Sequence, residues 1–273
     1  LAAAITPRTR VVLPVHFAGL PVDMDPLYAL AAKHGLRVIE DAAHAIGTEY
    51  KGRRIGAFGD TQLFSFPPKK NMTTGQVGCI TTRDPALAQQ SALLRFHGMD
   101  REAWDRFGKK VSQHYEIVLP GFKYNMMDMQ AALGLHQLAQ LDEFIQQRTL
   151  LAQTYQQQLA GWPALTLPQT PAFAHRHAWH LYTPRINPEA AGLDRDAFMA
   201  AMKARNIGTG LHYRPVHLYP YYREHYGFKP GDFPHAEHIG AHIVSLPLFP
   251  AMHASDQARV IDAMRDIFRG GRT

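Results

Sequence analysis

Two short apolar runs separated by a helical stretch constrain the fold of this chain most strongly. The first run covers residues 9–16 and the second covers residues 36–41. Asp25-Pro26 opens the helical stretch between them, and Gly35 follows its last turn, as is usual at the two ends of a helix. A strand, a helix and a strand at this spacing form a right-handed unit with parallel strands. The sequence therefore predicts an α/β fold, a mostly parallel sheet with helices on both faces.

Further elements continue this pattern as far as residue 160. Strands are predicted at residues 61–66 and 77–82, and Asp84-Pro85 opens a helix at residues 86–95. Residues 97–122 have no clear period and predict an irregular excursion. A long helix is predicted from Met126 to about Leu159. Ligands of such sheets gather at the carboxyl ends of the strands, which draws attention to Asp41.

A change in composition marks the predicted domain boundary. Pro163 and the segment Pro168-Gln169-Thr170-Pro171 interrupt the regular pattern. Beyond them we expect a strand at residues 179–186, a helix capped by Asp194, an aromatic loop at residues 212–226, and two more helices, the second beginning at Ser255. Residues 1–160 are thus predicted to form part of a large domain that includes the start of a long interdomain helix. Residues 161–273 are predicted to form a small α+β domain.

Composition and charge exclude several classes of protein. The single cysteine, Cys79, excludes an internal disulfide framework and is typical of a reducing cytosol. No apolar run approaches the roughly 18 residues that span a bilayer, and no signal peptide is visible. The net charge of +6 is scattered rather than gathered into a basic arm, so we expect no nucleic-acid role. Residues 1–5 resemble the tail of a helix, so we expect the chain to begin within a longer protein.

The segment Glu40-Asp41-Ala42-Ala43-His44 carries the first candidate chemistry. A carboxylate at the end of a buried strand is costly unless a cation meets it. Asp41 would serve as a partner for a protonated ring nitrogen, an arrangement that keeps a pyridinium charged. The alternative is that Asp41 caps a following helix while His44 packs in the core, and the residues of this segment alone do not exclude it.

The second candidate is the loop after the strand at residues 61–66. It contains Lys69 and Lys70, followed by Asn71-Met72-Thr73-Thr74-Gly75. A lysine in a partly desolvated pocket has a lowered pKa and can attack a carbonyl carbon. Hydroxyls and backbone N–H groups nearby can bind a phosphate. A solvated pair of lysines is the alternative.

Together, these two segments closely resemble the DegT/DnrJ/StrS family of sugar aminotransferases, which use pyridoxal phosphate (PLP). The shared motifs are Val-Ile-Glu-Asp-Ala-Ala-His at residues 38–44 and Phe-Ser-Phe-x-x-x-Lys-Asn-Met-Thr-Thr-Gly at residues 64–75. The similarity extends through residues 14–19, 121–132, 177–182 and 245–250 in the same order, and so covers nearly the whole chain. It implies the type I fold of PLP-dependent transferases, that of aspartate aminotransferase.

The resemblance implies a role for each matching residue. Lys70 directly precedes the Asn-x-Thr-Thr-Gly segment and matches the lysine that holds PLP, whereas Lys69 occupies a variable position. Asp41 matches the acid that faces the pyridine nitrogen. His44 falls where many members have Gln and some have His, beside the ring. Ser65 matches the serine that binds the cofactor phosphate.

Other parts of the chain vary from the family pattern. Lys123 and Asn125 resemble the segment that crosses a dimer interface to the phosphate of the neighbour, where many members read Asn-Tyr-Arg. Which of the two contacts phosphate stays open, and Asn125 could instead cap the long helix. Gln76-Val77 replaces the usual Glu-Gly, and Pro67-Pro68-Lys69 is also unusual. The family's upstream Ser-Gly-Thr turn and ring-stacking aromatic residue have no counterpart, so we expect a fragment that binds PLP weakly or not at all.

Two groups of histidines need separate interpretations. His175, His177 and His180 have no cysteine or acid at a fitting spacing, so we expect no metal site. The loop at residues 212–222 resembles the family loop that closes over the active site. His212, Tyr213 and His217 are therefore candidate substrate-binding residues, unless the loop is a surface loop anchored by its tyrosines.

The sequence thus predicts a cytoplasmic PLP-dependent aminotransferase in amino-sugar or polysaccharide biosynthesis. The resemblance implies glutamate as the donor, a nucleotide-linked keto-sugar as the acceptor, and a homodimer with shared active sites. Another PLP reaction, such as sugar dehydration, is an alternative, but dehydratase relatives carry His where this chain has Lys70. The other alternative is a non-catalytic protein that binds PLP or forms a dimeric scaffold.

Overall fold

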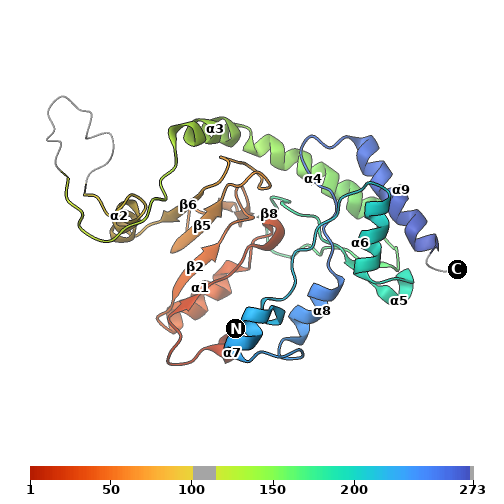
Figure 1. Ribbon diagram of the computed structural model, residues 1–273, viewed down its shortest axis with the longest axis horizontal. Coiled ribbons are helices and arrows are strands. Elements are labelled where there is room, and N and C mark those ends of the chain that lie inside the picture. Colours follow the sequence, from red (N-terminus) through yellow and green to blue (C-terminus); the bar gives the residue numbers. More distant parts are fainter. Residues whose placement is uncertain (101–114, 271–273) are drawn as a thin grey trace. The chain divides into compact units, whose positions relative to one another are not determined.

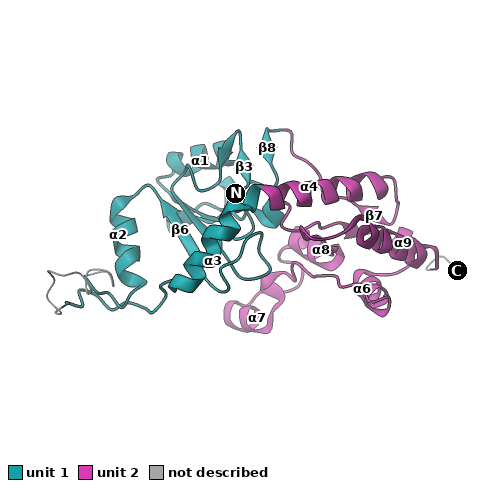
Figure 2. Cartoon of the chain, turned by 90° about the horizontal axis from the view of Figure 1, so that it is seen from above, with its two compact units in different colours: residues 1–142, 173–178 teal, residues 143–172, 179–273 magenta. Residues whose placement is uncertain are grey.

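The chain contains two compact units in the computed structural model, which describes residues 1–100 and 115–270 (Figures 1 and 2). The first unit comprises Leu1–Asp142 and Phe173–Ala178, and the second comprises Glu143–Ala172 and Trp179–Thr273. The division between these two units lies near residue 142, and the predicted domain boundary at residue 160 stays a prediction. The short segment at residues 173–178 returns to the first unit.

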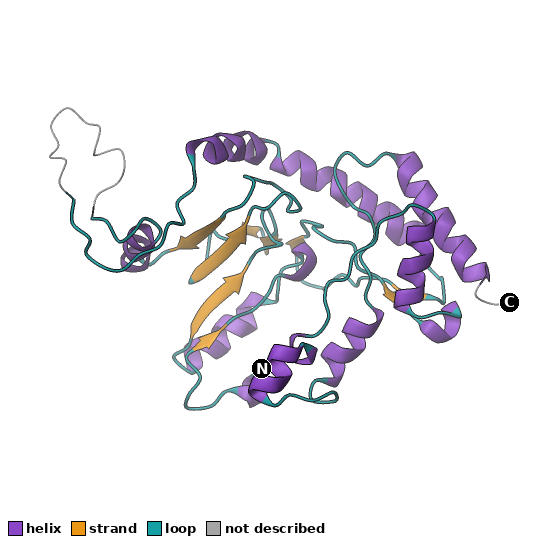
Figure 3. Ribbon diagram, in the orientation of Figure 1, coloured by secondary structure: helices purple, strands orange, loops and turns teal. Residues whose placement is uncertain are grey.

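The first unit contains both helices and strands, whereas the second unit is mostly helical (Figure 3). Residues 1–142 and 173–178 contain β1 (Val11–Val12), α1 (Met24–Lys33), β2 (Arg37–Asp41), β3 (Glu49–Tyr50), β4 (Arg53–Arg54), β5 (Thr61–Ser65), β6 (Gly78–Thr82), α2 (Pro85–Leu94), α3 (Asp128–Ala139) and β8 (His175–Arg176). The remaining elements are α4 (Leu141–Gln158), β7 (Leu165–Thr166), β9 (Arg185–Ile186), α5 (Pro188–Ala191), α6 (Arg195–Ala204), α7 (Pro220–Tyr226), α8 (Pro234–His242) and α9 (Ala254–Gly270).

The main sheet of the first unit has the strand order β1-β2-β5-β6. Strands β1, β2 and β5 are parallel, which confirms the predicted α/β architecture. Strand β6 is antiparallel to β5, so the sheet is mixed. A parallel strand would need a crossover, usually through a helix, whereas the loop between β5 and β6 contains none.

The sheet has one buried face against α1. Met24, Leu27 and Ala31 form the buried stripe of this helix, which packs against β2. Alternation along β2 buries Val38 and Glu40, while Ile39 and Asp41 on the opposite face are half-buried. Because of this alternation, one face of the sheet lies in the core, and polar side chains are accessible on the other face.

The second unit has its own hydrophobic core. Tyr155 on α4, Phe198 and Met202 on α6, and Met264 and Phe268 on α9 pack into it. The predicted cap of α6 is confirmed, because the Asp194 side chain accepts a hydrogen bond from the Ala197 N–H at 2.8 Å. The aromatic loop predicted at residues 212–226 contains the short helix α7.

Two predicted elements are interrupted. The long helix from Met126 is two helices, α3 and α4, separated at Gln140. The strand predicted at residues 179–186 is reduced to β9, because Trp179 has a positive φ of 45° and Pro184 has no N–H to donate. Residues 101–114 of the predicted irregular excursion lie outside the described residues.

Gly59 supports the buried face of the sheet, and its replacement should be costly. Its φ is +87°, and an added Cβ would overlap the Tyr28 hydroxyl and lie 2.7 Å from Glu40 Oε1. We expect Gly59→Ala to lower the free energy of unfolding by roughly 3 kcal/mol, measured by urea denaturation. Gly52→Ala is the matched control, since Gly52 has a φ of +74° and no described atom within 4 Å of an added Cβ. It should cost only about 1 kcal/mol, and equal losses would contradict the steric argument.

Candidate active site

The pairing of β2 with β5 places two candidate side chains on one face of the sheet. Asp41 is aligned with Leu63 in this parallel pair, and Ser65 lies two residues beyond Leu63. Side chains two residues apart on a strand point to the same face. Asp41 and Ser65 therefore share the accessible face at the carboxyl ends of their strands, the place where such sheets bind ligands.

The Asp41 carboxylate is oriented by the turn that follows β2. Its Oδ1 accepts a hydrogen bond from the Ala43 N–H at 2.9 Å. No helix begins within residues 42–48, directly after Asp41, so its side chain caps a turn rather than a helix. Within residues 1–100 and 115–270, no hydrogen bond is donated to the other oxygen, Oδ2. One carboxylate oxygen is thus fixed, and the second can meet a cationic ligand.

Lys70 lies in the loop after β5, close enough to Asp41 for their charges to interact. Its amine is half-buried, and burial lowers the pKa of Lys70 from its ordinary value, an effect that the charge of Asp41 partly opposes. In the described part of the chain the Lys70 Nζ makes no hydrogen bond. Lys69, by contrast, is exposed. The structure therefore gives the two neighbouring lysines different environments, with Lys70 as the partly desolvated amine.

The loop that carries Lys70 is fixed by hydrogen bonds on both sides. The Lys70 N–H donates to the Pro67 carbonyl at 3.0 Å, and Thr73 Oγ1 donates to the Phe66 carbonyl at 2.9 Å. The buried Asn71 donates from Nδ2 to the Ala178 carbonyl at 2.7 Å. Asn71 was not predicted as a functional residue, although its position directly after Lys70 was the available signal.

Helix α3 packs closely on the same loop. The Gln137 side chain accepts a hydrogen bond from the Thr73 N–H at 3.3 Å, and a Cβ added at Gly134 would lie 2.8 Å from Thr74 Cγ2. Thr74 Oγ1 is buried and has no hydrogen-bond partner among the described residues. The absence of a side chain at Gly134 therefore allows this close approach, and the loop presents a polar atom that a ligand could satisfy.

His44 lies on the turn after Asp41 and is buried. Its Nδ1 accepts a hydrogen bond from the Ala18 N–H at 3.3 Å, and its ring is tilted against Phe17 with centroids 6.1 Å apart. Because Nδ1 is the acceptor, the ring proton is placed on Nε2. This tautomer could not be predicted from a local pattern, because it depends on a backbone contact 26 residues away.

Lys123 and Asn125 lie in the segment before α3. The Lys123 ammonium lies 4.4 Å from the centroid of the Phe96 ring. Asn125 Nδ2 donates to the Met126 carbonyl at 3.4 Å, and its buried Oδ1 has no partner among the residues that the structure describes. None of their described contacts is with Asp41, Ser65 or Lys70. Their role at a phosphate stays a prediction.

The three candidate substrate residues belong to the second unit. His212 Nδ1 is 2.7 Å from Ser245 Oγ, and Tyr213 is exposed. His217 is buried, and its Nε2 is 2.8 Å from Glu237 Oε1. The imidazole of His217 thus forms part of the internal structure of this unit, and substrate binding by these residues stays a prediction.

Burial of Lys70 predicts a change in the reactivity of its amine. Since burial lowers the pKa of Lys70 from its ordinary value, its amine should become neutral, and react with an acylating reagent, at lower pH in the folded protein than in the unfolded chain. We would measure the labelling of Lys70 against pH in cofactor-free protein, folded and in urea, by peptide mass spectrometry. A Lys70 profile that is the same in folded and unfolded protein would contradict the described environment.

Comparison with known proteins identifies the family. The sequence profile of the DegT/DnrJ/EryC1/StrS aminotransferase family matches residues 1–265. The chain is 47% identical to the spore coat polysaccharide biosynthesis protein SpsC of Bacillus subtilis (strain 168), over 99% of this chain and 69% of SpsC.

Solved structures agree with this assignment. S. venezuelae DesV in complex with a ketimine intermediate has 39% identity and a TM-score of 0.87, over 98% of this chain and 67% of DesV. The PLP-form of Spr1654 from Streptococcus pneumoniae has 26% identity and a TM-score of 0.88, over 100% of this chain and 71% of that chain. The fold is therefore that of PLP-dependent sugar aminotransferases. This chain belongs to the DegT/DnrJ/EryC1/StrS aminotransferase family.

Proposed function

We propose that this chain forms the catalytic centre of an aminotransferase that moves an amino group from glutamate to a nucleotide-linked keto-sugar. The observation that carries the proposal is a half-buried, partly desolvated Lys70 amine close enough to the Asp41 carboxylate for their charges to interact. The family assignment supports sugar amination as the reaction class. The donor, the nucleotide and the position of the ketone are the finer parts of the proposal.

The cofactor is pyridoxal phosphate, in agreement with the family and the PLP-form of Spr1654. The described residues fit this group, because a carboxylate, an amine and a hydroxyl remain available for its ring nitrogen, aldehyde and phosphate. These are Asp41 Oδ2, Lys70 Nζ and Ser65 Oγ, which accept or donate no hydrogen bond within the described ranges. When bound, PLP supplies an electron-withdrawing ring that stabilises negative charge at the substrate carbon.

Each of these side chains has a separate task in the proposed reaction. The Lys70 amine would hold the cofactor, and as a neutral base it would move a proton between a carbon of the substrate and a carbon of the cofactor. A lowered pKa suits this task, since only the neutral amine accepts a proton. Asp41 keeps the ring nitrogen protonated, and Ser65 donates to the phosphate. His44, with its proton on Nε2, can donate to the phenolic oxygen of the ring.

The proposed substrate and assembly rest on the charge of the chain and on its family. The net charge of +6 suits a diphosphate-bearing substrate, and the family acts on sugars. A homodimer with shared active sites and a cytoplasmic location also stay predictions. None of the helices in residues 1–100 and 115–270 is both long and apolar enough to cross a bilayer.

Spectral changes of the bound cofactor test the proposed function in two half-reactions. Protein loaded with PLP is mixed with glutamate, which should remove the visible absorption band. Addition of a nucleotide-linked keto-sugar should then restore the band and release an amino-sugar, detected by mass spectrometry. The same keto-sugar without its nucleotide is the control. The proposal would be contradicted if 2-oxo acids restored the visible band while no keto-sugar tested restored it or gave an amino-sugar.

A further inference from the structure

His16 contacts two consecutive residues of β2 at once. Its backbone N–H donates to the Asp41 carbonyl at 3.0 Å, and its ring Nε2 lies 2.8 Å from Glu40 Oε2. Both His16 and Glu40 have 0% exposure, although each carries an ionisable side chain. A fully buried pair of this kind is costly unless all of its polar atoms find partners, so its position beside Asp41 requires an explanation.

The position of the His16 proton follows from the second ring nitrogen. The Val22 N–H donates to Nδ1 at 3.1 Å, so Nδ1 is the acceptor and carries no proton. The proton therefore lies on Nε2, which donates to Glu40. The imidazole is thus a fixed link between the backbone at Val22 and the carboxylate of Glu40.

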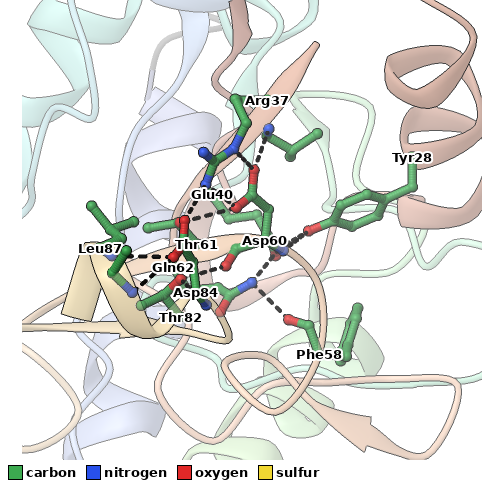
Figure 4. Close-up of polar contacts among 12 residues, drawn as sticks. Tyr28, Arg37, Glu40, Phe58, Asp60, Thr61, Gln62, Thr82, Asp84 and Leu87 are labelled. Atoms are coloured by element: carbon green, nitrogen blue, oxygen red, sulfur yellow. Dashed lines mark hydrogen bonds and ion pairs between the residues drawn. The ribbon is translucent and has the colours of Figure 1, made fainter. Parts of the chain in front are cut away.

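Glu40 is also held from the opposite side. The Tyr28 hydroxyl and Gln62 Nε2 both donate to Oε1, at 2.5 and 2.7 Å, and Figure 4 shows both side chains pointing toward Glu40. Burial raises the pKa of Tyr28, which keeps its hydroxyl a donor. With three donors on one carboxylate, the rotamer of Glu40 is fixed.

The same contacts enclose the backbone of Asp41. Its N–H donates to the Pro14 carbonyl at 2.8 Å, and its carbonyl accepts from His16, so residues 14–16 pair with Asp41 on one edge. The Ala42 N–H donates to the Leu63 carbonyl at 2.9 Å on the other edge. The direction of the Asp41 side chain therefore depends on where His16 holds residues 14–16 relative to β2.

We infer that His16 and Glu40 are positioning residues, which hold the Asp41 carboxylate at the distance from Lys70 and the cofactor at which it acts. The pair touches neither Lys70 nor the accessible face of the sheet, because Glu40 points to the opposite face from Asp41. The pair acts on Asp41 in two ways. The His16 N–H is bonded to the Asp41 carbonyl, and Glu40 is the residue before Asp41 on β2. The role toward the cofactor rests on the proposed function, whereas the effect on Lys70 does not.

Two substitutions of His16 separate its two ring contacts. His16→Asn places an acceptor near the position of Nδ1 and loses the bond to Glu40, whereas His16→Gln places a donor near the position of Nε2 and keeps that bond. The readout is the pH dependence of Lys70 acylation in cofactor-free protein. Because the charge of Asp41 raises the pKa of Lys70, displacement of Asp41 in His16→Asn should move the labelling profile to lower pH. His16→Gln should keep the wild-type profile.

A second readout is the affinity for PLP, followed by absorbance. His16→Asn should raise the dissociation constant by about tenfold, the lower end of the effect of residues that orient a ligating group, and His16→Gln should change it much less. Tyr28→Phe is the matched control: it removes a different hydrogen bond to Glu40, and it should lower thermal stability without moving the Lys70 profile.

The inference is overturned if His16→Asn lowers thermal stability but keeps the wild-type Lys70 profile. It is also overturned if Tyr28→Phe shifts that profile as much as His16→Asn does. Should His16→Asn fail to fold, His16→Gln decides alone: a wild-type profile supports the inference, and a shift as large as that of Asp41→Asn rejects it. Because these profiles come from cofactor-free protein, they are independent of failure to aminate a sugar.

Discussion

Replacement of Lys70 by alanine should abolish both the visible band of the bound cofactor and the amination reaction. Alanine removes the half-buried amine that we propose to hold the cofactor and carry the proton. Since proton transfer by a positioned base contributes roughly 10²–10⁴-fold, and attachment of the cofactor is lost as well, we expect kcat to fall by roughly 10⁴-fold or more. The measurements are the visible spectrum after addition of PLP and the rate of amino-sugar formation.

Lys69→Ala is the matched control for this experiment. Lys69 is the adjacent residue, carries the same functional group and is exposed, so its removal should leave the spectrum and kcat within about twofold of wild type. Exogenous methylamine should partly restore the reaction of Lys70→Ala, because a small amine can occupy the vacated space and accept the proton. A visible band and turnover that survive in Lys70→Ala but disappear in Lys69→Ala would assign the cofactor to the other lysine.

The second large effect is expected for Asp41→Asn. Asparagine keeps the size of the side chain and can still accept the hydrogen bond from the Ala43 N–H, but it carries no negative charge to keep the ring nitrogen protonated. We expect kcat to fall by about 100-fold or more, comparable to the loss of one electrostatic contact to the transition state. The folded structure should persist, as measured by thermal denaturation.

Asp41→Asn should also change Lys70 in a direction set by the charges. The Asp41 carboxylate raises the pKa of Lys70 against the lowering by burial, so its removal should lower that pKa further. More of the Lys70 amine is then neutral at any pH below its pKa, and acylation in cofactor-free protein should extend to lower pH. If Asp41→Asn slows turnover and also makes the Lys70 amine more reactive, the loss of activity comes from the missing Asp41 charge and not from general unfolding. A shift of the profile to higher pH would contradict the proposed geometry.

The parts of the site that the sequence could predict are those that depend on local patterns. The apolar run before Asp41 and the turn residues around Lys70 indicated a carboxylate and an amine at strand ends. The resemblance to the family then connected the two segments. The alternation along β2 and β5 also implies that Asp41 and Ser65 share a face, once the register of the strands is known.

The remainder depends on contacts between distant residues, which a local pattern does not contain. The antiparallel direction of β6 follows from how the loop after Ser65 turns back, and the division of the long helix at Gln140 has no proline or glycine to mark it. In the sequence, His16 is the last residue of the apolar run at residues 9–16. Only the structure shows that it is bonded to Glu40, 24 residues away. The signal that was available is an ionisable residue on the buried side of a strand.

The hydrogen bond between Asn71 and the Ala178 carbonyl has a consequence for biosynthesis. It joins residues 107 positions apart, and the Ala178 N–H in turn donates to the Gly19 carbonyl at 2.9 Å. Contacts with such long loops form late because the entropy of closing the loop opposes them. A nascent chain that has not yet emerged from the ribosome beyond residue 178 therefore lacks the anchor of the lysine loop. Competence to hold the cofactor should appear only after most of the polypeptide has been synthesised.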